Sequence, residues 1–133
     1  MSSDNSKKRH FSEIELPTFS DFRGSLTVLE KEMPFPIRRV FWMYGADGKT
    51  RGGHRHNRTR LALVSIIGEV VLHMDDGVWR EDILLNSPKR CVLVEPKDWH
   101  TMHFGASSVL LVFASDPYDP ADYIYEPYQR GTE

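Results

Sequence analysis

Prolines and glycines interrupt this chain so often that long helices are excluded. Eight prolines and nine glycines are spread through its 133 residues, and they leave segments of roughly five to eight residues, which is the usual length of a β-strand. No stretch of about twelve residues or more shows a helical repeat. The spacing therefore predicts an all-β domain, built as a sandwich or a closed barrel, and a jelly roll fits both the number of strands and the chain length.

Runs of apolar and β-branched residues mark the expected strands. Between two of these runs, Asp75-Asp76-Gly77 is a strong hairpin-turn signal. The best candidate helix is short, with Asp119 as its cap and Pro120 in its first turn, and it extends to Tyr125. The strands are expected at Leu26–Leu29, Arg39–Tyr44, Leu61–Ile67, Val70–Met74, Trp79–Leu85, Cys91–Val94 and Val109–Ala114.

The composition excludes several classes of protein. An apolar fraction of 40% with 11% aromatic residues excludes a disordered chain. A formal net charge of -2 argues against binding to nucleic acid through bulk positive charge. The single cysteine, Cys91, excludes an internal disulfide and a cysteine-based zinc site. The longest apolar run is far shorter than the ~20 residues that span a bilayer, so no membrane partner is expected.

The first ten residues differ in character from the rest. Residues 1–10 are polar and basic, and they are predicted to form a disordered tail. Residues 11–133 are predicted to form a single domain. No targeting segment is visible, and together with the free Cys91 this favours a cytoplasmic protein.

The densest functional signal is the segment Arg51–His56, in which two glycines precede two histidines spaced one residue apart. Because alternate residues of a strand face the same side, His54 and His56 would project together. Paired imidazoles can bind a metal or transfer protons near neutral pH. The alternative is a solvated basic loop, since several arginines surround the pair.

The spacing around the histidine pair resembles the first motif of the cupins. The intervals between glycines and histidines over residues 48–68 match that motif, but Leu61 stands where it places a metal-binding glutamate, and leucine cannot ligate a metal. His100 and His103 lie near the position of the second motif's histidine, but neither falls at its spacing. The chain is thus similar to a cupin that has lost its metal site and kept two histidines, which favours acid–base chemistry without a metal.

From Phe19 to Tyr128 the chain resembles one family in particular, the cupin-type sugar 3,4-ketoisomerases that act on dTDP-4-keto-6-deoxyglucose, also called WxcM-like. Many separate matches in the same order are more specific than any one of them. The matching segments are Asp21 to Leu26 with Glu30, Pro34 to Val40, Arg51 to His56, Asp75 to Gly77, Pro96 to Met102, Val109 to Ser115, Tyr118-Asp119 and Asp122 to Ile124.

The chain departs from the family pattern at a few positions. Arg55 replaces an alanine between the histidines, Asn57 replaces a lysine after them, and Leu61 replaces a glutamine. A tyrosine expected near Phe41-Trp42 is also missing, although Tyr44 is close. The histidine pair itself is intact. The resemblance implies a cupin jelly roll, a homodimer, catalytic residues His54 and His56, no metal and no cofactor.

The reaction that the resemblance implies suits a pair of histidines. A 3,4-ketoisomerase removes the proton on C3 of a 4-keto sugar, which gives an enediol or enediolate that is reprotonated at C4. A second proton passes between the two oxygens. Imidazole gives and takes protons near pH 7, so two histidines can divide these tasks. Which histidine serves carbon and which serves oxygen stays open.

A nucleotide-linked keto-deoxysugar, with dTDP as the expected nucleotide, also needs binding groups. Arginine binds phosphate in a bidentate way, and an aromatic ring can support the base or the sugar. For each of these residues a surface or core role is the alternative. The candidates are Arg51, Arg58, Arg60 and the more remote Arg39 for the phosphates, with Trp42, Tyr44 and Trp99 as aromatic platforms.

Other functions stay open at this point. An epimerase of the same substrate class also removes a proton beside a ketone. A nucleotide-sugar binding module without turnover would fit the changes at Asn57 and Leu61, and Leu61 argues against a metal-dependent oxygenase. The favoured function is the metal-independent isomerisation, on a route to an unusual sugar of a surface polysaccharide such as an O-antigen.

Overall fold

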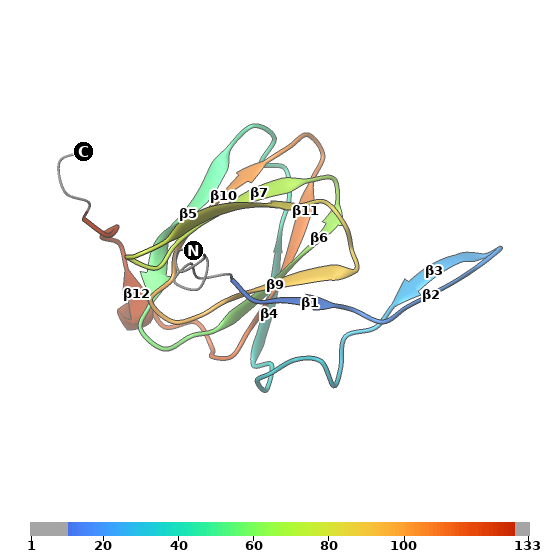
Figure 1. Cartoon of the computed structure of the whole chain (residues 1–133), viewed down its shortest axis with the longest axis horizontal. Helices are drawn as coiled ribbons and strands as arrows, with labels where there is room; N and C mark the ends of the chain where they lie inside the picture. Colours follow the sequence, from blue (N-terminus) through green and yellow to red (C-terminus); the bar gives the residue numbers. More distant parts are fainter. Residues whose placement is uncertain (1–10, 130–133) are drawn as a thin grey trace, which may run out of the picture.

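Two five-stranded antiparallel sheets face each other in the computed structural model, which describes residues 11–129 (Figure 1). The predicted tail, residues 1–10, lies outside the described residues. The first sheet has the order β1 (Glu13–Glu15), β9 (Arg90–Val94), β6 (Leu61–Ile67), β11 (Val109–Ala114), β4 (Arg39–Met43). The second has the order β12 (Tyr123–Ile124), β5 (Thr50–His56), β10 (Trp99–Phe104), β7 (Val70–Asp75), β8 (Arg80–Leu85).

The all-β prediction is confirmed. Strands β6 and β11 have the predicted bounds, and the other predicted strands lie within two residues of the observed ones. The Asp75-Asp76-Gly77 turn joins β7 to β8, as expected. The predicted helix is wrong in length: only Pro120–Asp122 form a turn of 3-10 helix, with Asp119 as its cap. The chain then becomes strand β12, because its backbone pairs with β5.

The main core fills the space between the two sheets. Strand β6 shows how it forms, because alternate side chains of a strand face opposite sides. Leu61 and Leu63 point into the core between the sheets, whereas Ala62 and Val64 belong to a second apolar cluster. This cluster includes Phe35 and Cys91. Burial raises the pKa of the Cys91 thiol to about 11, so this cysteine is a small apolar core residue, as expected.

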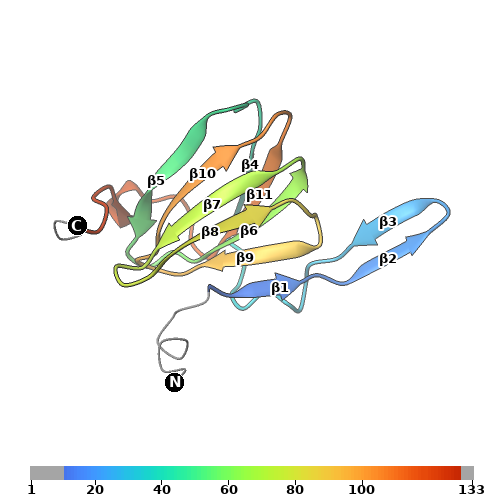
Figure 2. The same ribbon diagram turned by 45° about the horizontal axis from the view of Figure 1, so that its top comes forward.

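A hairpin of β2 (Thr18–Asp21) and β3 (Gly24–Thr27) extends away from both sheets (Figure 2). Its two strands pair with each other and, among the described residues, with no other strand. It exposes large apolar side chains, of which Phe22 is 96% exposed and Phe19 65%. No helix within residues 11–129 has the length and apolar character needed to cross a membrane.

Candidate active site

Two consecutive glycines shape the strand that carries the predicted histidine pair. Gly52 and Gly53 of β5 both have positive φ, at +88° and +83°. The register between β5 and β10 shifts at this point, so that His54 pairs with His100 while Gly52 pairs with Thr101. Such a bulge bends a strand and redirects its side chains. Here it places His54 directly opposite His100.

Three imidazoles therefore meet where the sequence predicted two. The ring centroid of His54 lies 5.0 Å from that of His56 and 4.9 Å from that of His100. The inference that no second-motif histidine joins the pair is wrong, because His100 reaches it through the bulge rather than through the motif's spacing. His103 lies on the opposite face of β10, where it contacts Thr50.

The hydrogen bonds of two of these histidines fix which ring nitrogen carries the proton. His56 Nδ1 donates to Asp122 Oδ2 at 3.0 Å, and His100 Nδ1 donates to the carbonyl oxygen of Asp98 at 3.1 Å. Because a carboxylate and a carbonyl only accept, both Nδ1 atoms carry the proton and both Nε2 atoms are acceptors. His56 Nε2 is covered from solvent and has no hydrogen-bond partner among residues 11–129.

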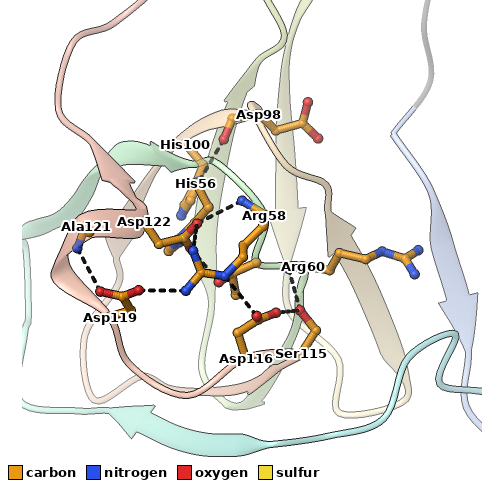
Figure 3. A network of polar contacts seen from close by, with 11 residues as sticks. His56, Arg58, Arg60, Asp98, His100, Ser115, Asp116, Asp119, Ala121 and Asp122 are labelled. Atoms are coloured by element: carbon orange, nitrogen blue, oxygen red, sulfur yellow. Dashed lines mark hydrogen bonds and ion pairs between the residues drawn. The ribbon is translucent and has the colours of Figure 1, made fainter.

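Asp122 is the acidic partner that sequence reasoning missed. Its carboxylate also accepts hydrogen bonds from the Thr59 hydroxyl and from the Arg58 amide, the latter at 2.8 Å (Figure 3). Burial raises the pKa of Asp122, but the hydrogen bonds from Thr59, Arg58 and His56 outweigh it, so the pKa lies below its usual value. Asp122 is thus an ionised, 1%-exposed carboxylate that orients His56.

The three imidazoles are held in their neutral form. Burial, reinforced by the neighbouring histidine, lowers the pKa of His54 to about 4 and that of His100 to about 3. Burial also lowers the pKa of His56, although Asp122 works in the opposite direction. Neutral imidazoles at pH 7 are ready to accept a proton, and the one beside Asp122 gains most support when it does so.

The histidines line a cavity of about 240 Å³ between the sheets. Among the predicted substrate-binding residues, Arg39 and Arg51 also line it. Tyr123, which the sequence analysis gave only as part of the family-matching segment Asp122 to Ile124, contributes a ring 4.8 Å from that of His54 and 4.6 Å from that of His56. The cavity thus has acid–base groups, an aromatic wall and two cationic side chains.

The other two predicted arginines are not brought to the cavity. Arg58 lies among carboxylates and forms ion pairs with Asp116 and Asp119 (Figure 3). Arg60 forms an ion pair with Glu95, with N–O distances of 2.8 and 3.0 Å. Their positive charge is therefore matched within the chain, which the local sequence does not reveal because all three carboxylates come from distant segments.

The predicted aromatic platforms are not at the cavity either. Trp42 lies on the outward face of β4 and is 58% exposed, whereas its neighbours on either side, Phe41 and Met43, line the cavity. Tyr44, beyond the end of β4, is 70% exposed. Trp99 precedes His100 on β10 and so faces the opposite side of that strand.

The three imidazoles also form a group that could hold a metal ion, because one ring nitrogen of each lies within 4.8 Å of the others. Three histidines with water in the fourth position are one arrangement of a catalytic zinc site. The structure thus supplies a third nitrogen that the sequence analysis did not expect. Leu61 lines the same cavity and offers no ligand atom.

The bulge in β5 gives a first prediction, on stability. A Cβ at Gly52 would lie 2.9 Å from the carbonyl oxygen of His100, whereas a Cβ at Gly53 would meet nothing within 4 Å. Alanine at either position is strained by the positive φ, at a cost of about 1–2 kcal/mol. Gly52→Ala is expected to lower the free energy of unfolding by clearly more than the control Gly53→Ala. Equal losses in urea unfolding would show that the close approach of β10 is unimportant.

The two facing sheets define a cupin jelly roll, with a histidine-lined cavity between them. The family described as "FdtA: WxcM-like, C-terminal" matches residues 9–130, and the chain belongs to this family. A TDP-4-oxo-6-deoxy-α-D-glucose-3,4-oxoisomerase from Aneurinibacillus thermoaerophilus is 41% identical over 123 residues, which are 88% of each chain.

Solved structures agree with this assignment. The sugar 3,4-ketoisomerase QdtA from Thermoanaerobacterium thermosaccharolyticum, in complex with TDP, is 33% identical with a TM-score of 0.84 over 86% of this chain and 87% of that one. The epimerase RmlC from Legionella pneumophila shares only 16% identity with a TM-score of 0.73, over 84% of this chain and 69% of that one. The second likeness concerns the fold alone, and it confirms the predicted jelly roll.

Proposed function

We propose that this protein is an isomerase that converts a dTDP-linked 4-keto-6-deoxyhexose into its 3-keto isomer. The observation that carries the proposal is the neutral histidine cluster, backed by Asp122, in a cavity of a chain that belongs to this family. Relatives named as 3,4-oxoisomerase and 3,4-ketoisomerase support it, and a variant of QdtA has been crystallised with TDP-4-keto-6-deoxyglucose.

The proposed chemistry uses His54 and His56 as the acid–base pair. One neutral imidazole takes the proton from C3, and the electron pair moves onto the C4 carbonyl oxygen to give an enediolate. The imidazolium then returns a proton at C4, while the O3 hydroxyl proton passes by way of the other imidazole to O4, which leaves a ketone at C3 and a hydroxyl at C4. Both protons move between nitrogen and substrate atoms, so the step needs no oxidant and no hydride donor. The ionised Asp122 stabilises the imidazolium form of His56.

Deuterium exchange tests this function directly. We expect incubation with dTDP-4-keto-6-deoxyglucose in D₂O, followed by NMR, to show deuterium entering at C4 together with a 3-keto product. An epimerase would instead exchange a proton beside the ketone and keep the carbonyl at C4. Binding without any exchange would indicate a nucleotide-sugar binding module. Either of these two results would contradict the proposal.

A second prediction concerns metal. Because the proposed proton transfers use neutral imidazoles, and Leu61 stands where a carboxylate ligand would be needed, turnover is expected to be unchanged after incubation with EDTA. The control is the metal content of the freshly purified protein, measured by mass spectrometry. One transition-metal ion per chain that is lost together with activity on chelation would overturn metal independence.

A third prediction concerns assembly into a homodimer. The β2–β3 hairpin exposes Phe19 and Leu26, and the outer face of the first sheet exposes Trp42 at 58% and Ile66 at 40%. A hollow lined by Leu16 and other apolar residues opens on this outer face. Exposed apolar surfaces of this kind are typical of interfaces between subunits. We propose that a second copy covers them.

Light scattering at micromolar concentration measures the assembly. The dimer is expected to dissociate in Leu26→Glu, whereas the control Val78→Glu, in the β7–β8 turn at a 70%-exposed site, stays dimeric. A monomeric wild-type protein would contradict the prediction.

We further propose a cytoplasmic location, which suits a nucleotide-sugar substrate and a reduced Cys91, and a role in making deoxysugars for a surface polysaccharide.

A further inference from the structure

Arg39 is the less exposed of the two arginines that line the cavity. On β4 the side chains of Arg39, Phe41 and Met43 line the cavity, while those between them face outward. Its guanidinium carbon lies 5.2 Å from the centre of the Phe41 ring and 5.7 Å from that of Tyr118. These contacts hold the group against aromatic faces, which leaves its N–H edge available for an acceptor.

The hydrogen bonding of Arg39 differs from that of its neighbours. Arg58 and Arg60 form ion pairs with carboxylates, and Arg51 is exposed, with its Nε 3.1 Å from Met43 Sδ. Arg39 Nε is covered from solvent and has no hydrogen-bond partner within residues 11–129. A buried donor without an acceptor is costly and uncommon in proteins, so it indicates a group placed to meet a ligand.

The proposed reaction places negative charge on an oxygen of the substrate, and the resting histidines carry no permanent positive charge to meet it. Enolisation puts negative charge on the C4 oxygen, while burial keeps the three imidazoles neutral. Arg39 lines the same cavity as His54 and His56, and its charge is one of the influences that lower the pKa of His56. A guanidinium does not lose its proton in a protein, so it can stabilise an oxyanion without competing as an acid.

We propose that Arg39 is a catalytic residue that donates a hydrogen bond to the C4 oxygen of the substrate and stabilises the enediolate, rather than a ligand for the diphosphate. The inference rests on the proposed function and deepens it. In the first half of the reaction the proton leaves C3 for an imidazole and the electron pair moves to the C4 oxygen, which Arg39 faces. Arg39 keeps its own protons throughout, and Arg51, nearer to solvent, is left to meet the phosphates.

Two glutamine variants and one lysine variant test the assignment. Loss of one oxyanion donor typically costs ~10²–10³ in kcat, so Arg39→Gln is expected to lose turnover in that range. Its Kd for TDP, which has no sugar and no ketone, is expected to stay within about threefold of wild type, because only the transition state is affected. Arg39→Lys keeps the charge, so its kcat is expected to lie between those of the wild type and Arg39→Gln. The matched control Arg51→Gln is expected to raise KM and the Kd for TDP while kcat is largely kept.

A second measurement does not depend on turnover. Removing the positive charge of Arg39 should raise the pKa of His56, which NMR titration of the imidazole detects in the Arg39→Gln protein. The Arg51→Gln protein is expected to show a smaller change. Thermal melting of all variants checks that they fold.

The outcomes separate the inference from the proposed function. A wild-type protein that neither isomerises nor exchanges deuterium would overturn the function and this inference with it. An active wild type with Arg39→Gln near wild-type kcat would overturn the inference alone. The same holds if Arg39→Gln weakens TDP binding and raises KM at unchanged kcat, because Arg39 would then be a diphosphate ligand. If Arg39→Gln does not fold, Arg39→Lys decides between the same two results.

Discussion

Replacing either His54 or His56 with asparagine is expected to lower turnover by ~10²–10⁴, which is the usual contribution of a general acid or base. Asparagine keeps part of the size and hydrogen bonding of histidine, but it cannot take up or release a proton near pH 7. TDP binding and the melting temperature are expected to change little. The measurements are kcat by NMR, the Kd for TDP by calorimetry, and thermal melting.

His103→Asn is the control for these two variants. His103 lies on the same strand as His100 but on its other face, where it is exposed and contacts Thr50. It is expected to keep wild-type turnover. If the pair has only a structural role, both cavity variants would melt at lower temperature and keep their rate per folded molecule. Near-wild-type turnover in both would remove the catalytic assignment.

The second large effect is expected from Asp122→Asn, with a loss of turnover on the order of 10²–10⁴. The reason lies in the donors around the carboxylate. The Arg58 amide donates to Oδ1, so the amide oxygen of an asparagine would have to stay on that side. Its NH₂ group would then face His56 Nδ1, which would have to become an acceptor. The proton would move to Nε2, so the nitrogen that accepts a proton would no longer face the cavity.

Nitrogen NMR of His56 reports this exchange of tautomers even if turnover is too slow to measure. Asp119→Asn is the matched control, because Asp119 belongs to the same Arg58 cluster but forms an exposed ion pair, which contributes little to stability or to the histidines. We expect Asp122→Asn to lose about 1–3 kcal/mol of unfolding free energy as well, through imperfect pairing of buried donors. Unchanged turnover and an unchanged tautomer would show that Asp122 does not position His56.

The sequence predicted strand bounds most accurately where a continuous run of apolar residues coincides with a buried strand. Continuous apolar runs fixed β6 and β11 to the residue, because both faces of these strands pack against other side chains. Strand β10 was missed because it alternates polar and apolar residues, and one of its inward positions is a histidine. The same feature hid His100 from the site, since only the bulge at Gly52 and Gly53 brings it opposite His54.

Several residues of the site could not be predicted from local sequence, because they come from segments that are far apart in the chain. The two histidines are one residue apart in sequence and so carry their own signal, whereas Asp122 lies 66 residues from His56 and entered the sequence analysis only as part of a family-matching segment. Arg58 and Arg60 stand beside the pair in sequence but point to carboxylates. The aromatic wall comes from Tyr123, and the predicted tryptophans face away because strand alternation places them on the other side.

Asp122 and β12 follow β5 by more than 60 residues in the chain, which affects when the site can form during protein synthesis. Strand β5 is made long before its partner β12, which pairs with His56 and Arg55. Pairing between such distant segments is slow, because the entropy of closing a long loop is lost before the stabilising contacts can form. Until the segment that carries Asp122 has been made, His56 therefore lacks the carboxylate that orients it. The proposed acid–base site is completed only when β12 pairs with β5, whichever strands have formed before.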